Sequence, residues 1–540
     1  MSPVFSDGRQ VPITPNGTLF DYADMLKVRV PTSCGRTGEC HECIVEIKKG
    51  SRALNDPTPE ESFLREGYRL ACKAIVSDVK SDIEFSTLRR QPRILTSGIK
   101  RKIDLEPRVI KKDGSVISNN VVLDSYRGSI LGLAGDIGTT TVVLNLVDLE
   151  TGETLITSSF ENPQRFGGAD VMNRISYDGG AYPGELQQVM LSSINFEIGS
   201  MTKECGVHRR QIYDVVLVGN TTMRDITFGI DVQSIGEKPY KSLIQRDYES
   251  STRKTTTIEC DAKTLGLRVH PKSKVYSGPL VSSHIGSDVA ADMLAISLDE
   301  TCDPIMLVDV GTNTEVVIGN KYGMVAASCP AGPAFEGGQV TYGMPGYDGA
   351  VESVKIEGDT VTISTIGKAD PEGICGSGIV DLLSELRRNN IMNELGAFNN
   401  GSTKFTFASE KDMYLDRSDI SALAQAKSAN YSGQYIALRH YGKSIDEIEK
   451  LFLAGGFANY VNSENAKSIG FISNFPSSKI EKIGNSSLEG ATLMLKSTNL
   501  RSRIEELVKN VSHIELETTP DFFDIFVEGC MFKEMPKEIS

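Results

Sequence analysis

One short motif occurs twice in this chain, each time directly after a run of apolar residues. Asp136-Ile137-Gly138-Thr139-Thr140-Thr141 ends the first run, and Asp309-Val310-Gly311-Thr312-Asn313-Thr314 ends the second, 173 residues later. A Gly-Thr-x-Thr turn presents backbone N–H groups and hydroxyls to a phosphate, and the preceding carboxylate can hold Mg²⁺ through water. A single copy would be an ordinary threonine-rich hairpin turn. Two copies that face each other are expected to clamp a triphosphate.

The surrounding pattern predicts two similar α/β lobes, lobe one at about 130–300 and lobe two at about 301–540, because strands alternate with longer amphipathic helices from Ile130 onward. Strands are predicted at 131–136, 142–148, 215–218, 305–309, 315–318, 361–364 and 451–454, and helices at 379–389, 418–441 and 488–495.

Three further glycine-rich turns follow in the second half. Gly455, Gly456 and Phe457 come directly after a predicted strand, and paired glycines allow a flat adenine or a ribose to approach closely. The run 333–338 carries Glu336, Gly337 and Gly338, and the run 373–378 carries Gly376 just before a helix whose N-terminus favours anions. Neither a Walker A motif nor a G-x-G-x-x-G fingerprint competes with this nucleotide site.

Four of the ten cysteines lie before residue 73. Cys34, Cys40 and Cys43 have C-x5-C-x2-C spacing, and Cys72 follows in Arg-Leu-Ala-Cys. Three ligands in one tight loop and one distant ligand match the 2Fe-2S ferredoxins of the plant and adrenodoxin kind. A zinc site that includes His41, and unliganded thiols, are the alternatives; we expect His41 to lie at the rim of the cluster. The other six cysteines are interpreted as ordinary thiols, although Cys329 and Cys375 lie in glycine-rich loops that can border a pocket.

Before the first lobe, the sequence predicts a small cysteine-rich domain at 1–88 and a basic linker at 89–129. The domain begins like a hairpin around Asn16-Gly17, and a helix is predicted from Thr18 to Lys27. Nine Lys or Arg side chains stand between Leu88 and Lys112, interrupted by prolines and a glycine. Such a run is typical of a solvated tether, or it docks on an acidic surface.

The overall charge bears on the partners. The chain has 57 basic and 71 acidic side chains and a formal net charge of −14, which disfavours a nucleic-acid or anionic-membrane binder. No apolar run reaches the 18 or more residues of a spanning helix, and the N-terminus lacks the apolar core of a signal peptide. We therefore expect a cytoplasmic protein without membrane contact.

From residue 130 the chain resembles the ATPase fold that actin, sugar kinases and heat-shock chaperones share, with Asp136–Thr141 and Asp309–Thr314 as the phosphate motifs. With the N-terminal cysteine loop, Gly219-Asn220-Thr221-Thr222-Met223 and the runs 329–337 and 373–378, nearly the whole chain closely resembles the reductive activators of corrinoid proteins. That resemblance implies a β-grasp 2Fe-2S domain before two RNase H-like lobes. It also implies ATP-dependent one-electron reduction of cob(II)alamin to cob(I)alamin on the corrinoid subunit of a methyltransferase or O-demethylase.

The same resemblance implies roles for individual residues. Asp136 and Asp309 should organise Mg²⁺ and the attacking water, and Glu336 should reach the γ-phosphate unless it is only a turn residue. The phosphate contacts are expected from Gly138, Thr139, Thr140, Thr141, Gly311, Thr312, Asn313 and Thr314, with the turn glycines Gly337, Gly338 and Gly376 near the nucleotide. Gly455, Gly456 and Phe457 should line the adenosine side. A low-potential electron donor is implied, as is a homodimer.

Other readings of the same features are possible. An activator of 2-hydroxyacyl-CoA dehydratases has this ATPase fold but shares one 4Fe-4S cluster between subunits, which the ferredoxin loop argues against. A small-molecule kinase with a redox-sensing ferredoxin domain would yield a phosphorylated product. An electron carrier with a degenerate ATPase region is disfavoured by the intact Asp136 and Asp309.

Overall fold

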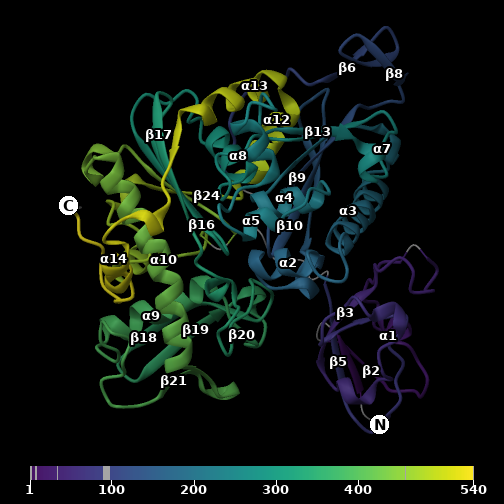
Figure 1. Cartoon of the computed structure of the whole chain (residues 1–540). Coiled ribbons are helices and arrows are strands. Elements are labelled where there is room, and N and C mark those ends of the chain that lie inside the picture. The colour runs from purple at the N-terminus through teal and green to yellow at the C-terminus, as the bar shows by residue number, and fades with distance from the viewer. Residues whose placement is uncertain (1–2, 7–8, 33, 89–97, 457, 539–540) are drawn as a thin grey trace.

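The computed structural model describes residues 3–6, 9–32, 34–88, 98–456 and 458–538. A small N-terminal domain lies beside a larger body of two lobes, and the chain passes from the small domain into the first lobe (Figure 1). Among the helices of these described residues, none is long and apolar enough to cross a membrane.

The N-terminal domain is a mixed sheet with one helix across it, in the strand order β2-β1-β5-β3-β4. Its elements are β1 (Pro3–Ser6), β2 (Arg9–Pro12), α1 (Leu19–Leu26), β3 (Ile44–Lys49), β4 (Tyr68–Leu70) and β5 (Ile83–Thr87), with 3-10 turns at Ser51–Ala53 and Pro59–Glu61. A capping box starts α1, because Thr18 and Asp21 satisfy each other's backbone N–H groups. The helix prediction is confirmed.

The expected hairpin exists, but its turn is elsewhere. Strands β1 and β2 pair antiparallel, so the connection falls at residues 7–8, outside the described residues. Asn16 and Gly17 come after β2, where Asn16 has a φ of 65° just before the helix cap. The Asn16-Gly17 pair forms a turn that leads into a helix and does not connect two strands. Composition alone does not distinguish these two kinds of turn.

The segment that the sequence assigned to a tether is folded where the structure describes it. Strands β6 (Val109–Lys112), β7 (Ser115–Ser118) and β8 (Val121–Ser125) form a three-stranded antiparallel sheet. Upstream of this sheet, the buried Arg101 guanidinium binds the buried Asp299 carboxylate of lobe one at 2.7 Å. Arg108 likewise binds Glu259 at 2.7 Å. Arg101 and Arg108 therefore dock on acidic partners, and the expectation of a solvated tether is wrong for these two residues and for the sheet at 109–125. Residues 89–97 lie outside the described part.

Lobe one is built on a six-stranded sheet in the order β11-β10-β9-β12-β14-β13. Its strands are β9 (Leu131–Ile137), β10 (Thr141–Asp148), β11 (Thr154–Glu161), β12 (Ile212–Val218), β13 (Ile258–Asp261) and β14 (Lys274–Ser277). Its helices are α2 (Val171–Asp178), α3 (Glu185–Glu204), α4 (Thr221–Thr227), α5 (Gln233–Gly236), α6 (Leu243–Glu249), α7 (Ala262–Leu265) and α8 (Ser287–Ala295), with 3-10 helices η3 (Pro163–Gly167) and η4 (Arg209–Gln211).

Lobe two repeats the plan on the sheet β24-β23-β15-β16-β17-β25. Its strands are β15 (Ile305–Val310), β16 (Thr314–Asn320), β17 (Gly323–Cys329), β23 (Leu451–Ala454), β24 (Ile480–Gly484) and β25 (Val511–His513). Additional strands are β18 (Ala350–Glu357), β19 (Thr360–Thr365), β20 (Gly373–Ile374), β21 (Lys404–Ala408) and β22 (Met413–Asp416). Its helices are α9 (Gly376–Arg388), α10 (Arg417–Tyr441), α11 (Ser463–Ser468) and α14 (Phe522–Gly529), with short 3-10 turns that include η5 (Ala334–Glu336). The predicted strands and helices and the two-lobed α/β fold are confirmed.

One part of the chain beyond residue 301 packs with lobe one. Helix α12 (Ser486–Lys496) lies against α8 and against strands β9 and β12, and α13 (Thr498–Leu507) follows it. Helices α12 and α8 touch at Gly490 of α12 and Ala291 of α8. This close contact requires glycine, because a Cβ on Gly490 would lie 2.0 Å from the Ala291 carbonyl oxygen. Assigning all of 301–540 to lobe two therefore does not match the packing, since a pattern of helices does not say which sheet each one covers.

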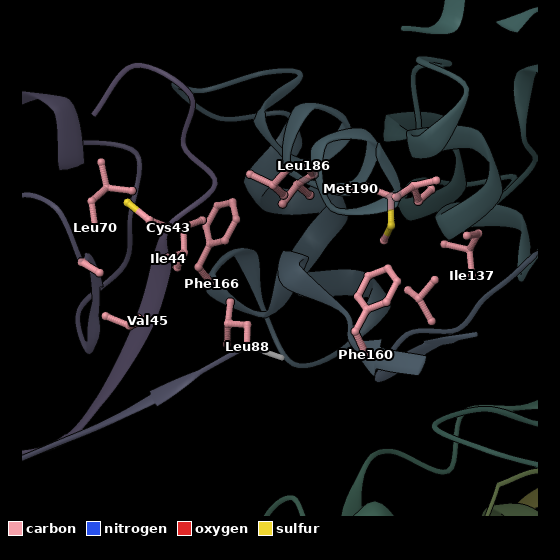
Figure 2. Close-up of a cluster of buried hydrophobic side chains, with 14 of the residues drawn as sticks. Cys43, Ile44, Val45, Leu70, Leu88, Ile137, Phe160, Phe166, Leu186 and Met190 are labelled. Carbon is pink, nitrogen blue, oxygen red and sulfur yellow. The ribbon is translucent and has the colours of Figure 1, made fainter. Parts of the chain in front are cut away.

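The N-terminal domain is docked on lobe one through a continuous apolar core. Buried side chains of β3 and of the end of β5 join those of η3 and α3 in one cluster. Figure 2 shows Phe166 of η3 between Ile44 on the side of the small domain and Leu186 of α3. The two domains are thus packed together as well as covalently joined.

Candidate functional site

A cavity of about 220 Å³ lies between the two lobes, where strand ends from both sheets meet. The following predicted residues line it: Asp136, Gly138, Thr139, Thr140, Thr141, Asp309, Gly311, Thr312, Asn313, Glu336, Gly376, Gly455 and Gly456. Thr314, Gly337 and Gly338 are not among the lining residues, and Phe457 lies outside the described residues. Both copies of the repeated motif therefore face one space.

The first loop, residues 138–140, connects β9 to β10, and the structure holds it from behind. The carbonyl oxygens of Gly138, Thr139 and Thr140 accept hydrogen bonds from Asn162 Nδ2 at 2.7 Å, from Arg174 Nη2 at 2.7 Å and from the Asn162 backbone N–H at 2.8 Å. On the cavity side, the Thr139 hydroxyl accepts from Asn220 Nδ2 at 3.0 Å. The loop is pre-shaped before any phosphate arrives.

The second loop, residues 311–313, connects β15 to β16 and is held within lobe two. The Gly311 N–H donates to the Asn313 carbonyl at 3.0 Å, and the Gly332 N–H donates to the Thr312 carbonyl at 2.8 Å. Thr314 begins β16 and is completely buried, which explains why its side chain does not reach the cavity.

Glu336 joins the two loops across the cavity. Its Oε2 accepts from the Thr140 hydroxyl of lobe one at 3.0 Å and from the Thr312 hydroxyl of lobe two. Burial raises the pKa of Glu336, and the two threonine hydroxyls oppose that shift. The residue is more than a turn position, because its carboxylate contacts both motifs.

The floor of the cavity is rich in partly buried carboxyl groups. Burial raises the pKa of Asp136 to about 7, and Asp309 adds to the shift although Asn485 opposes it with a hydrogen bond of 2.8 Å to Oδ2. Burial likewise raises the pKa of Asp309 to about 6, and that of Asp288 to about 8 with help from Asp136 and Asp309. These carboxylates are short of positive charge in the protein alone.

Electrostatics at this cavity fit a nucleotide that arrives with a divalent cation. Among the described residues that line the cavity there is no Lys or Arg, whereas five of them are Asp or Glu. The first turns of helices α8, α9 and α12 line the cavity with Asp288, Gly376 and Ser486, and helix N-termini favour anions. A polyphosphate needs a cation beside these carboxylates, and Mg²⁺ takes oxygen ligands of this type.

The turn after β23 borders the same space. Gly455 has a φ of 104°, and a Cβ on it would lie 2.2 Å from the Val310 carbonyl oxygen, so the close approach to β15 requires glycine. Cys375 lines the cavity next to Gly376, as its glycine-rich loop predicted, whereas Cys329 is buried beside Gly433.

The four N-terminal cysteines come together in two pairs. The sulfur atoms of Cys43 and Cys72 lie 3.4 Å apart, and those of Cys34 and Cys40 lie 3.9 and 4.0 Å from the same Thr32 hydroxyl. The loop that carries three of them turns through left-handed backbone conformations, including Gly35 at a φ of 67° and Gly38 at 91°.

This arrangement fits a two-iron cluster. No three His, Cys, Asp or Glu side chains of the described residues converge as a single metal ion requires, whereas a 2Fe-2S cluster takes two thiolates on each iron. The Cys72 thiol and burial raise the pKa of Cys43, and a bound metal would oppose this shift by stabilising the thiolate. His41 turns away, since its Nδ1 lies 2.9 Å from Glu185 Oε2 of α3.

Comparison with known proteins agrees with both parts. The model of the 2Fe-2S iron-sulfur cluster binding domain matches residues 4–77. The model of the RACo middle region matches residues 131–301, and that of the C-terminal domain of RACo, the ASKHA domain, matches residues 303–539. The chain belongs to the RACo family. Its N-terminal region is a 2Fe-2S ferredoxin domain, and its remaining part has the fold of actin, sugar kinases and Hsp70.

Relatives of this RACo-family chain cover from 73% to 97% of its length. The corrinoid activation enzyme RamQ of Eubacterium limosum is 26% identical over an alignment of 591 positions. The alignment covers 97% of this chain and 97% of RamQ. The [Co(II) methylated amine-specific corrinoid protein] reductase of Methanosarcina barkeri is 23% identical and covers 73% of this chain and 76% of its own. A solved structure of a reductive activator for a corrinoid, iron-sulfur protein has a TM-score of 0.72 at 28% identity and covers 100% of this chain and 99% of its own.

Several cavity residues of this RACo-family chain were not singled out from the sequence. Asp288, Glu315, Asn485, Ser486 and Ser487 line the cavity, and the buried Asp292 accepts hydrogen bonds from the last two of these. Asn485 is the N-cap of α12, and Asn followed by Ser-Ser before a predicted helix is a capping signal that the sequence does show. Asp288, Asp292 and Glu315 carry no such signal, because acids in a helix or strand read as exposed positions.

Proposed function

We propose that this protein activates corrinoid proteins reductively, by passing one electron from its 2Fe-2S cluster to cob(II)alamin and forming cob(I)alamin at the expense of ATP. The observation that carries the proposal is that paired cluster thiolates and a two-loop nucleotide cavity lie in domains packed on each other. The family and the named activities of its relatives support it.

The electron step explains why ATP is needed. When bound, the cluster supplies one-electron transfer at a potential that is near −400 mV as a rule for ferredoxins of this type. A shortfall of about 100 mV against the cobalt acceptor corresponds to roughly 2.3 kcal/mol for one electron. ATP binding or hydrolysis in the cavity offsets such a cost by favouring one oxidation state of the partner complex.

We assign the nucleotide roles from the geometry of the cavity. Asp136 and Asp309 would hold Mg²⁺ through water, since both are partly buried acids with raised pKa values and a cation would stabilise their charged forms. The N–H groups of the two loops, with the hydroxyls of Thr139, Thr140 and Thr312, would contact the phosphates. Gly376, Gly455 and Gly456 would border the adenosine.

Glu336 has a role of its own in this proposal. Its carboxylate bridges the Thr140 and Thr312 hydroxyls, so phosphates that enter between the loops would displace it. A carboxylate released next to the γ-phosphate is placed to orient the attacking water and to accept its proton. Cys34, Cys40, Cys43 and Cys72 hold the cluster.

The partners that complete the reaction are also part of the proposal. The corrinoid subunit of a methyltransferase or O-demethylase receives the electron, and a low-potential ferredoxin, flavodoxin or reductase supplies it. We include a homodimer on the resemblance alone.

The test is a coupled reduction. Chemically reduced protein is mixed with a corrinoid subunit loaded with cob(II)alamin, and the absorbance of cob(I)alamin is followed with and without Mg-ATP. We expect the wild-type protein to form cob(I)alamin only with Mg-ATP. The Cys40→Ser and Asp136→Asn variants should form no cob(I)alamin even with Mg-ATP. Equal reduction without nucleotide, or none with any corrinoid subunit, contradicts the proposal. The visible spectrum of the purified protein, which differs between 2Fe-2S and 4Fe-4S clusters, separates it from the dehydratase activators, because one 4Fe-4S cluster shared by two subunits also gives two irons per chain.

A further inference from the structure

One stretch of 18 residues touches all three structural units of the molecule. Residues 161–178, here called the junction segment, comprise the end of β11, helix η3 and helix α2. Asn162, Phe166 and Arg174 in this segment have no exposed surface. The segment belongs to lobe one, lies behind the first phosphate loop and reaches the ferredoxin domain at its other side.

At one side the junction segment supplies the donors for three consecutive carbonyls of the phosphate loop. Asn162 binds those of Gly138 and Thr140, and Arg174 binds that of Thr139. A peptide group is planar, so each of these carbonyls shares a rigid plane with the N–H of the next residue. When a phosphate draws those N–H groups toward the cavity, the carbonyls behind them rotate together, and the donors on Asn162 and Arg174 are displaced.

At the other side the same segment holds the ferredoxin domain. The Tyr177 hydroxyl donates to the Phe63 carbonyl at 2.5 Å, and the Phe166 and Phe63 rings meet edge to face with centroids 5.6 Å apart. Phe63 in turn stacks on His41 at 4.1 Å, between Cys40 and Cys43 in sequence. Figure 2 shows Phe166 facing the strand that begins after Cys43. The path from phosphate loop to cluster loop is a chain of buried contacts.

Lobe two reaches the junction segment as well. The Tyr347 hydroxyl donates to the buried Glu161 carboxylate, which also binds Arg165 at 2.9 Å. Arg165 lies 4.0 Å from Glu46 of the ferredoxin domain. A movement of the lobes about the nucleotide therefore acts on the same segment through a second contact.

We propose that the junction segment couples nucleotide binding to the reduction potential of the cluster, with Arg174 and Tyr177 as positioning residues. The potential of an iron–sulfur cluster depends on the N–H groups near its sulfurs and on its exposure to water, and both depend on where the cluster loop lies. This inference rests on the proposed function and specifies how its two halves communicate. Linkage requires that the redox state of the cluster changes nucleotide affinity by the same factor.

The experiment compares Tyr177→Phe with a matched control. Tyr177→Phe keeps the ring and removes the hydroxyl that binds Phe63. Tyr126→Phe is the control. It removes a hydroxyl that likewise donates to a backbone carbonyl, that of Gly128 at 2.8 Å, but next to the β6–β8 sheet. The holoprotein is titrated with mediators, one electron per cluster, and visible circular dichroism is recorded with and without Mg-AMP-PNP. Affinity for Mg-AMP-PNP is measured on the oxidised and the reduced protein.

We expect affinities that differ by at least about threefold between the redox states of the wild-type protein, which equals a shift of about 28 mV for one electron. Tyr126→Phe should keep this shift, and Tyr177→Phe should retain no more than half of it with unchanged iron content. A smaller ratio in the wild-type protein, or the full shift in Tyr177→Phe, overturns the inference. Because cobalt is absent from this measurement, its result is independent of whether corrinoid reduction is observed.

Discussion

The two phosphate loops have nearly the same sequence and different surroundings. The carbonyls of loop 138–140 are bound by Asn162 and Arg174, which belong to a segment that continues to the ferredoxin domain. The carbonyls of loop 311–313 are bound by Gly311 and Gly332, both within lobe two. The duplicated motif thus faces one cavity from two sides, and among the described residues it is the first copy whose carbonyls are bound by a segment that reaches the ferredoxin domain. The asymmetry lies in the supporting residues and not in the motif.

The largest effect is expected from removing the carboxylate of either motif. Asp136→Asn and Asp309→Asn keep the side-chain shape and remove the charge that would face Mg²⁺, so each should lower ATP turnover by on the order of 100-fold. Iron content should stay unchanged. The exposed Asp359→Asn is the control. Near wild-type turnover in one of the two variants would show that only the other loop takes part in catalysis.

A second test separates the two acids by pH. Burial raises the folded-state pKa of Asp136 to about 7 and that of Asp309 to about 6, both above the ordinary value of 3.8 for an aspartate. A raised pKa means that the folded protein binds more protons than the unfolded chain, so its contribution to stability is complete below about pH 4 and declines through pH 6 to 7. Each unit of difference corresponds to about 1.4 kcal/mol.

Thermal unfolding of the nucleotide-free protein checks this expectation. The midpoint should fall more between pH 5 and 8 in the wild-type protein than in either Asn variant, and Asp136→Asn should flatten the slope more than Asp309→Asn. Mg-ADP should reduce the slope. Identical slopes in all three proteins would contradict the assigned burial of charge.

A smaller effect is expected where the loops meet. Glu336→Gln removes a negative charge that faces the phosphates but keeps an acceptor for one threonine hydroxyl. ATP turnover should fall by about tenfold, and the affinity for Mg-AMP-PNP should rise slightly. A lower affinity for Mg-AMP-PNP with unchanged ATP turnover would instead show that Glu336 only holds Thr140 and Thr312 in place.

The smallest change in nucleotide affinity is expected from a substitution that removes a ligand of the cluster. Cys40→Ser should abolish the visible 2Fe-2S absorption, because the cluster loses one of its four thiolates. The affinity for Mg-AMP-PNP should change by no more than about threefold, since Phe63 and Tyr177 still hold the domain on lobe one. A collapse of nucleotide binding would mean that the ferredoxin domain is part of the ATP site.

The motifs and elements were predictable because their signals are local. The cysteine spacing, the Asp-x-Gly-Thr turns and the strand and helix patterns follow from nearest neighbours in the sequence. Docking was not predictable, since Phe63, Phe166 and Tyr177 follow no periodicity and their contacts join distant parts of the chain. The same holds for Arg101, which reads as part of a basic tether until its buried partner Asp299 is known. It also holds for Asp288, which lines the cavity together with Asp309 of the second lobe.

The return of α12 to lobe one has a consequence for biosynthesis. Strands β9 and β12 are covered on one side by a helix that starts at Ser486, about 190 residues after the end of α8. At a translation rate of about 5 to 20 residues per second, roughly 10 to 40 s pass between the synthesis of α8 and that of the helix that covers these strands. The ferredoxin domain, in contrast, contains its own sheet within the first 87 residues. In the nascent chain the ferredoxin domain can therefore fold early, whereas the ATPase lobes are completed late. A ribosome-bound chaperone would bind the uncovered apolar face of lobe one in the meantime.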